Sequence, residues 1–303
     1  MVNLRYHIVS LTAVFLALGL GILAGTTVID DQVVKGLRAN TAALRNDLDR
    51  MRDNVSQLQS QLNIWDEFGK SIASSLLQGQ LAGRAVVILS DEKVPGALNA
   101  QISDAFRLAN AKRPTRLTLK QKFVDPSSFV SLAEALGTTA GTSAEALMEE
   151  AGRRIGGRLG GSADPRASDD LLGKLSGGGF LDIADLPASG PFPAANALVV
   201  FVTSGDTEES LLSRSFFIPA LRALSSSRVA CSAEPTTAKD HVAELVRRDT
   251  AISRSVCTVD HVDTVPGRLS LVYALRTLIA GRAAEHYGIR GGVDGIAPAF
   301  RPA

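Results

Sequence analysis

Residue types that build metal centres are scarce in this sequence. Among its 303 residues there are two cysteines, four histidines and three methionines. Two cysteines are too few for a zinc ribbon, a four-cysteine iron–sulfur cluster or a disulfide scaffold. Four histidines leave little for an enzyme with several metal ions, and three methionines cannot form a methionine-rich tract for soft metals. The sequence therefore excludes these classes of metalloprotein.

An excess of charge of one sign is also missing. Lysine and arginine number 32 against 31 acidic residues, so the formal net charge is only +1. A protein that binds nucleic acid through its phosphates needs a strongly basic face or tail, so we expect no nucleic-acid partner. What the chain does have is apolar material, because 45 % of its residues are hydrophobic, enough for one or two folded domains.

A long apolar run lies near the N-terminus. No Asp, Glu, Lys or Arg occurs between Arg5 and Asp30, and residues 8–29 are almost wholly apolar. As a helix this run would be roughly 33 Å long, which is enough to cross the hydrocarbon core of a bilayer. We therefore predict a transmembrane anchor over residues 1–29. The alternative is a cleaved signal peptide, whose apolar core is usually shorter, ~7–15 residues.

The charges beside the anchor predict its orientation. Arg5 precedes the apolar run, and Asp30 and Asp31 follow it. By the positive-inside rule, the N-terminus is expected in the cytoplasm and the rest of the chain outside it, in the cell envelope. Small residues every four positions would line one helix face and let two membrane helices pack closely; they are Ala17, Gly21 and Gly25. Such residues are also simply common in membrane helices.

A seven-residue apolar repeat follows the anchor, over residues 30–80. Its two sets of positions are Leu37, Leu44, Met51, Leu58 and Trp65, and Val34, Leu48, Val55 and Leu62, with the polar Thr41 as the one exception. This heptad pattern predicts a long coiled-coil helix, the stalk. Its partner is a second copy, held parallel by the anchor, or another protein; alternatively the helix folds back on its own domain. Gly69, Gly79 and Gly83 are expected to break the helix, with the boundary near Gly79–Gly83.

Residues 81–288 alternate between strand and helix patterns. Short apolar runs predict strands at 84–90, 115–119, 197–203, 228–231 and 255–259, and amphipathic segments between them predict helices. This alternation favours an α/β domain with a doubly wound, mostly parallel sheet. The glycine-rich segment 137–179 is expected to be an insertion or a mobile flap, and residues 289–303 a flexible tail.

Motifs of catalysis are missing, and acidic residues follow the predicted strands. Neither Gly-x-Ser-x-Gly nor His-Glu-x-x-His occurs, so no catalytic set can be assembled and an exported enzyme is the least favoured class. Asp91–Glu92 and Thr203–Asp206 come at the ends of two strands, where open α/β sheets bind ligands. The sequence Asp260-His261-Val262-Asp263 would suit an oriented base or a corner of a metal site, but structural hydrogen bonding is the favoured interpretation.

The two cysteines leave three interpretations open. Cys231 and Cys257 each end a predicted strand, so their sulfurs would meet if the strands are neighbours. An exported domain can keep a disulfide, which would add on the order of 3 kcal/mol of stability by closing the loop. The pair could equally stay as two buried thiols. Thiolates also suit Cu(I), and His261, four residues after Cys257, could then join as a third ligand.

Two blocks of sequence resemble a known family. They are the opening Asn3–Leu18 and the segment Ser255–Arg268, to which His286-Tyr287-Gly288 adds a shorter match. Both are similar to the actinobacterial copper transporter family typified by mycobacterial MctB. The resemblance implies a place in the cell envelope and a role in copper efflux and homeostasis, with copper as a transported or sensed ion. The family pattern has an acidic residue at the position of His261 and no cysteine at that of Cys257, so it does not support a metal role for this pair.

The same layout is similar to that of the corynebacterial protein SteB. That resemblance implies a scaffold that pairs with a membrane partner to control cell separation and envelope hydrolases. One apolar helix cannot line a pore by itself, and an anchor with a stalk suits a scaffold. The sequence therefore leaves two functional hypotheses, copper handling and scaffolding, and both place the chain at the membrane as a homodimer or heterodimer.

Overall fold

The computed structural model describes residues 4–27, 31–138, 143–206 and 211–299. The ends of the predicted anchor, part of the segment 137–179 and the end of the predicted tail lie outside the described residues. By its internal contacts the chain divides into two compact units, Met1–Trp65 and Asp66–Ala303.

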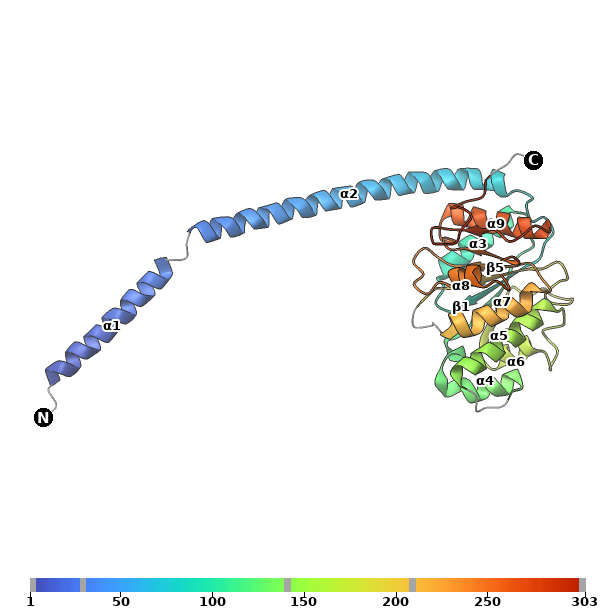
Figure 1. The fold of residues 1–303 in the computed structure, drawn as a ribbon, viewed down its shortest axis with the longest axis horizontal. Helices are drawn as coiled ribbons and strands as arrows, with labels where there is room; N and C mark the ends of the chain where they lie inside the picture. The colour runs from blue at the N-terminus through green and yellow to red at the C-terminus, as the bar shows by residue number, and fades with distance from the viewer. Residues whose placement is uncertain (1–3, 28–30, 139–142, 207–210, 300–303) are drawn as a thin grey trace. The chain divides into compact units, whose positions relative to one another are not determined.

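The first unit holds two helices, α1 (Leu4–Thr27) and most of α2 (Asp31–Leu77), both visible in Figure 1. Residues Arg5–Gly25 of α1 are long and apolar enough to cross a membrane, as predicted for the anchor. A signal sequence meets the same criterion, so retention of the anchor remains a prediction. At Gly21 and Gly25 an added Cβ would contact nothing within 4 Å, so packing of a second helix against this face also remains a prediction.

Helix α2 is continuous through the whole predicted heptad repeat. Val34 is partly buried, and the other apolar side chains of the repeat are exposed, with exposed fractions from 52 % at Leu48 to 69 % at Trp65. The prediction that Gly69 breaks the helix is wrong. An α-helix tolerates an isolated glycine, and a Cβ at Gly69 would lie 3.0 Å from Cγ1 of Val265, so this glycine permits close packing against Val265. The helix ends instead before Gly79 and Gly83, which adopt positive φ angles of 76° and 72°.

The last turns of α2 belong to the second unit. Ala73 and Leu77 are buried in its core, and the hydroxyl of Tyr273 donates a hydrogen bond to the carbonyl of Leu76 at 3.0 Å. The boundary between the two units lies after Trp65, earlier in the chain than the boundary expected near residue 80. The reason is that the last turns of α2 pack against the core of the second unit.

A seven-stranded mixed sheet forms the centre of the second unit, in the order β3-β2-β1-β4-β5-β6-β7. The strands are β1 (Val86–Asp91), β2 (Thr115–Leu119), β3 (Leu181–Ala184), β4 (Leu198–Val202), β5 (Ala230–Ala233), β6 (Val256–Val259) and β7 (His286–Tyr287). Every pairing is parallel except that of β2 with β3. The five predicted strands are confirmed, and the short edge strands β3 and β7 are additions.

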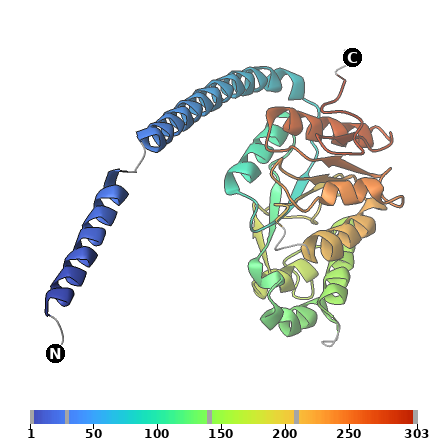
Figure 2. The ribbon, with the colours of Figure 1, turned by 60° about the vertical axis from the view of Figure 1, so that its left-hand side comes forward.

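Helices cover both faces of this sheet. Alternate residues of β1 enter two separate cores, Val87 and Leu89 on one face and Val86 and Ile88 on the other. The second face is covered by α3 (Gly96–Leu108), α9 (Val265–Ile279) and the end of α2. The first face is covered by α4 (Phe129–Leu136), α5 (Ala144–Gly160), α6 (Leu171–Gly177), α7 (Ile218–Ser225) and α8 (Val242–Arg248). Figure 2 shows α9 and the α4–α6 layer on opposite sides of the strands.

The glycine-rich segment 137–179 is part of the core, which corrects its interpretation as an insertion or a mobile flap. Its described residues form α5 and α6, whose side chains Met148, Ile155 and Leu175 are fully buried. Cβ atoms at Gly152 and Gly156 would lie 2.4 Å and 2.2 Å from backbone oxygens of Phe216 and Ala220. The glycines therefore permit close contact between α5 and the helical turns of 212–225.

Candidate functional site

The C-terminal edge of the sheet gathers the acidic residues that the sequence places after the strands. The sheet order makes the gap between β1 and β4 the switch point, since the chain leaves β1 towards β2 and resumes on its other side with β4. In open α/β sheets such a switch point is where loops diverge and ligands bind. The loops after β1, β4, β5 and β6 all meet here.

The buried carboxylate of Asp91 ties the first two of these loops together. Its Oδ1 accepts hydrogen bonds from the backbone N–H groups of Lys93 and Val94 at 3.0 and 3.1 Å, and its Oδ2 accepts one from Ser204 at 2.7 Å. Burial raises the pKa of Asp91, while the three N–H donors act in the opposite direction. Its neighbour Glu92 points outward and pairs with Lys120, which lowers the pKa of Glu92. Asp91 is thus a structural tie across the switch point.

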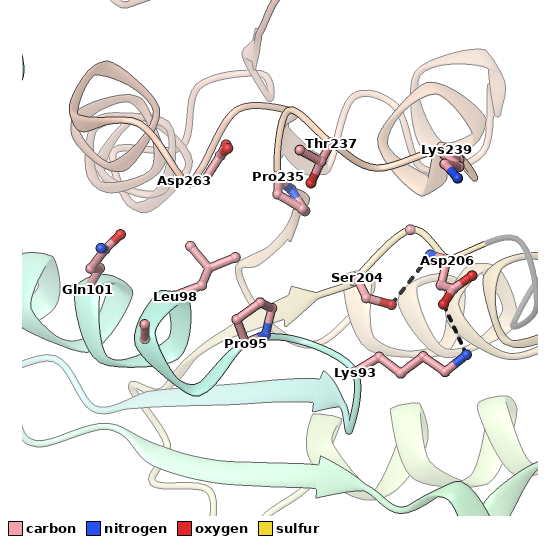
Figure 3. Close-up of a pocket in the computed structure, with 12 residues that line it drawn as sticks. Lys93, Pro95, Leu98, Gln101, Ser204, Asp206, Pro235, Thr237, Lys239 and Asp263 are labelled. Carbon is pink, nitrogen blue, oxygen red and sulfur yellow. Dashed lines mark hydrogen bonds and ion pairs between the residues drawn. The ribbon is translucent and has the colours of Figure 1, made fainter. Parts of the chain in front are cut away.

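A pocket of about 580 Å³ opens beside this tie (Figure 3). Pro95 and Leu98 form an apolar wall, and Ser204 and Asp206 come from the loop after β4. Further lining residues from the neighbouring loops and helix α3 are Lys93, Gln101, Pro235, Thr237, Lys239 and Asp263. The ammonium of Lys93 pairs with Oδ2 of Asp206 at 3.0 Å across the pocket. The pocket offers hydrogen-bonding groups of both charges, which suits a small polar ligand.

The loop after β4 is held close to the loop after β5. Gly205 has φ +65°, and a Cβ there would overlap the Cβ of Ala238 at 2.2 Å. The carbonyl oxygen of Gly205 accepts hydrogen bonds from the N–H groups of Lys239 and Asp240, at 2.8 and 2.9 Å. Only glycine fits this crossing, so Gly205 fixes the width of the pocket on this side.

Cys231 and Cys257 are neighbours, because the two strands that carry them are adjacent in the sheet, which is the condition set in the sequence analysis. They are register partners on β5 and β6, and both are fully buried. The sulfurs are not joined, and the Cys231 and Cys257 thiols donate to backbone oxygens of Ser232 and Ala230. Burial raises the pKa of the Cys231 thiol, and its neighbour Cys257 adds to this shift. Both sulfurs are therefore shielded from solvent, and a disulfide remains a prediction for the oxidised protein.

His261 does not join the two cysteines in a metal site. Four residues along an extended strand span about 13 Å, so His261 lies beyond the end of β6 while Cys257 lies within it. Across the residues that the structure describes, no three Cys, His, Asp or Glu side chains gather in a way that could hold a metal ion. Burial lowers the pKa of His261, although the nearby Asp260 carboxylate opposes this.

The acidic residues beside His261 have structural partners. Oδ2 of Asp260 accepts from Nη1 of Arg247 at 2.8 Å. The carboxylate of Asp263 accepts from the backbone N–H and the hydroxyl of Thr236, at 2.8 and 2.6 Å. These bonds link β6 to α8 and the β5 loop, in agreement with the favoured prediction of structural hydrogen bonding for this motif.

Sequence reasoning missed a buried ionic cluster that fixes residues 288–290. Asp260 also accepts from the N–H of Ile289 at 2.7 Å, and Arg290 donates to Oε1 of Glu234 at 3.0 Å. A Cβ at Gly288 would lie 2.0 Å from Oδ1 of Asp260, so only glycine fits there. The described part of the predicted flexible tail therefore begins with residues bonded to the core. In the sequence this close approach appears only as a glycine, Gly288, next to the predicted tail.

Comparisons with known proteins assign the chain to a family. A sequence profile described as "Copper transport outer membrane protein, MctB" matches residues 1–298. Copper transporter MctB of Mycobacterium tuberculosis is 29 % identical over 314 aligned positions, which cover 98 % of this chain and 99 % of that protein. The protein of the same name from Mycobacterium leprae is 25 % identical over the same coverage. The similarity thus extends over both units.

Proposed function

The chain belongs to the MctB family of copper transport proteins, and we propose that it acts in copper efflux and homeostasis as a single-span protein of the cell envelope. In this proposal α1 stays attached as the anchor, with the N-terminus in the cytoplasm. The α/β domain then lies on the far side of the membrane. The names of the mycobacterial relatives support the copper role, and the apolar helix Arg5–Gly25 supports the attachment to a membrane.

The proposal includes assembly through the stalk. The observation that carries it is the row of apolar side chains along α2, of which Leu44, Leu48 and Leu58 are all more than half exposed. Contiguous exposed apolar surface of this kind marks an interaction site. A heptad row over a helix of 47 residues is the pattern of a coiled coil, whose partner is a second copy or another envelope protein.

In this proposal the protein acts on copper as part of an assembly that forms through the stalk. The α/β domain neither catalyses a reaction nor holds a resident copper centre. The two thiols are buried, and burial raises the pKa of Cys231, whereas Cu(I) ligation requires accessible thiolates. The pocket at the switch point offers oxygen and ammonium groups, which are poor ligands for Cu(I). Copper is then the cargo of the system in which the protein works.

A second candidate function is favoured by the same exposed row. A SteB-like scaffold would use the coiled coil to pair with a membrane partner and control cell separation and envelope hydrolases. Anchor, stalk and domain suffice for such a role without any metal ligand. The two functions differ in what is lost when the protein is absent.

A deletion strain scored for two phenotypes separates these functions. Loss of a copper efflux component raises cellular copper and copper sensitivity, whereas loss of the scaffold leaves daughter cells attached. We expect a copper phenotype that the intact gene restores. Unchanged copper tolerance together with chained cells would overturn the copper proposal in favour of the scaffold.

Complementation with stalk variants tests whether assembly is needed. Leu44→Glu with Leu58→Glu places charges in the apolar row, and we expect this variant to fail to complement. Asn46→Glu with Ser60→Glu adds the same two charges on the opposite helix face and should complement fully. Equal complementation by both variants would remove stalk assembly from the proposal.

A further inference from the structure

The composition of the apolar row specifies how many helices it joins. In heptad notation the a positions of α2 are Val34, Thr41, Leu48, Val55 and Leu62, and the d positions include Leu37, Leu44, Met51 and Leu58. Branched residues at a with leucine at d favour two-stranded parallel coiled coils over trimers and tetramers. Three of the five a residues are branched at Cβ, and three of the four d residues are leucine.

We propose that α2 pairs with the same helix of a second copy of this chain, as a parallel, in-register, two-stranded coiled coil over residues 34–62. This inference rests on the proposed function only for the anchored stalk that assembles, and it names the partner. Two shallow hollows lie along the same stretch of α2, and their walls include Val34 and Leu37 in one and Leu48, Met51 and Val55 in the other, beside arginine and polar side chains.

The charges beside the row are complementary to those of a second copy. The e positions carry Arg38, Arg45 and Arg52, and the g position of the central heptad carries Asp47. In a parallel, in-register pair each g residue faces the e residue five positions later on the other helix. Asp47 of one copy then faces Arg52 of the second copy, and the pair occurs twice by symmetry. In an antiparallel pair the e positions face each other, which would set arginine against arginine.

These charged side chains are available for pairing between copies. Within the helix, Arg52 lies 3.4 Å from Asp49, and Asp47 lies 3.8 Å from Arg50. All four side chains are more than 60 % exposed, and exposed pairs of this kind contribute little to stability. They can therefore be exchanged for contacts between two helices. Because every copy inserts α1 in the same direction, the anchor also favours the parallel arrangement over the antiparallel one.

Cross-linking of the full-length protein in membranes tests the partner and the register. Thr41→Cys and Val55→Cys each place a thiol at an a position, with little change in side-chain size. We expect each variant to form a covalent homodimer on mild oxidation with diamide. Asn46→Cys and Ser60→Cys, on the opposite face, are the matched controls and should remain monomeric on gels. The native cysteines are buried, and the unmodified protein shows any background.

Each outcome supports or overturns the proposal. Cross-linking at both a positions supports it. In an antiparallel pair only one position along the helix can face the same position of the second copy, so two positions 14 residues apart cannot both cross-link. Cross-linking at one position only, or equally at the control positions, overturns the parallel register. Cross-links exclusively to a different protein overturn pairing with a second copy, while the assembling stalk of the proposed function would stand.

A charge exchange tests the predicted pair across the interface. Asp47→Arg alone sets arginine against arginine twice, and we expect a dimer weaker by roughly 10-fold in sedimentation of the full chain in detergent. The double variant Asp47→Arg with Arg52→Asp should restore the affinity. Asp53→Arg makes the same charge change on the outer face and should leave the dimer intact. A double variant as weak as the single one overturns the pairing of these residues.

Discussion

At the scale of single residues, Glu234 is a carboxyl group whose surroundings differ strongly from water. Its side chain is fully buried just after β5. Its Oε1 accepts a hydrogen bond from Nη1 of Arg290, and its Oε2 accepts one from the backbone N–H of Ala243. His241 lies 3.9 Å away, and Asp260 and Arg247 act on it from the next strand and from α8. Burial outweighs the two arginines and raises the pKa of Glu234 to about 7.

This raised pKa predicts a pH dependence of stability. Between about pH 4.5 and pH 7 the unfolded chain has Glu234 ionised while the folded domain keeps it protonated, so the folded state binds more protons. Stability therefore falls as the pH rises through this window, by on the order of 3 kcal/mol for the full shift, and levels off above it. Denaturant unfolding at pH 5, 6, 7 and 8 measures it.

Glu234→Gln isolates this contribution from that of other groups. Burial lowers the pKa values of His261 and His286, so these histidines give a change of opposite sign over a similar range. The difference in unfolding free energy between the natural chain and the glutamine variant removes their effect. We expect the natural chain to lose unfolding free energy relative to the glutamine variant as the pH rises from 5 to 8. A difference that stays constant would show that Glu234 does not titrate in this window.

At the scale of elements, the contact of α5 with the helical turns before and within α7 depends on two glycines. Gly156→Ala would place a Cβ 2.2 Å from the backbone oxygen of Ala220, which must then move away. We expect a loss of about 1–3 kcal/mol in thermal or denaturant unfolding, as for other overpacked cores. Gly157→Ala, one residue along the same helix, meets nothing within 4 Å and should stabilise by up to about 1 kcal/mol. Similar losses in both variants would contradict the close packing.

The elements with strong periodicity were predictable from the sequence. The strands β1, β2, β4, β5 and β6 are apolar runs or alternations, and they were placed within a few residues of their bounds. Strands β3 and β7 were missed because they are short, partly exposed edges whose pairing depends on distant residues. Segment 137–179 was misinterpreted because glycine in a sequence signals a turn, whereas here Gly152 and Gly156 serve helix packing.

The candidate site was only partly predictable. The residues after β1 and β4 lie at the C-terminal edge because that position follows from parallel topology. The pairing of Cys231 with Cys257 follows in the same way from the order of β5 and β6. The contacts of Arg290 with Glu234 and of Ile289 with Asp260 could not be predicted, since they join residues far apart in the chain without any periodic pattern.

At the scale of the whole molecule, the decisive property is whether α1 stays attached. We expect the full-length chain to remain in the membrane pellet after alkaline carbonate extraction, with an intact N-terminus by mass spectrometry, because Arg5–Gly25 is long enough to span the bilayer. Replacing Leu16 and Leu20 by arginine should release it, since each charge at mid-membrane costs about 2.5–3.5 kcal/mol. The same exchange at Leu44 and Leu48, outside the span, should leave the chain in the pellet.

Recovery of a shortened protein from the medium, beginning beyond Gly25, would contradict this expectation. Such a product would show that the segment acts as a signal peptide. The domain would then be a secreted protein, and pairing of the stalk would have to occur without any help from a common membrane.

The two thiols on β5 and β6 are sheltered from oxidation by copper. Exposed cysteines near copper ions are oxidised, because the ionised sulfur gives up electrons to the metal. Cys231 and Cys257 have no exposed surface, so they react only while the strands separate. The rate at which an alkylating reagent modifies these two thiols therefore measures how often the interior of the domain opens to solvent.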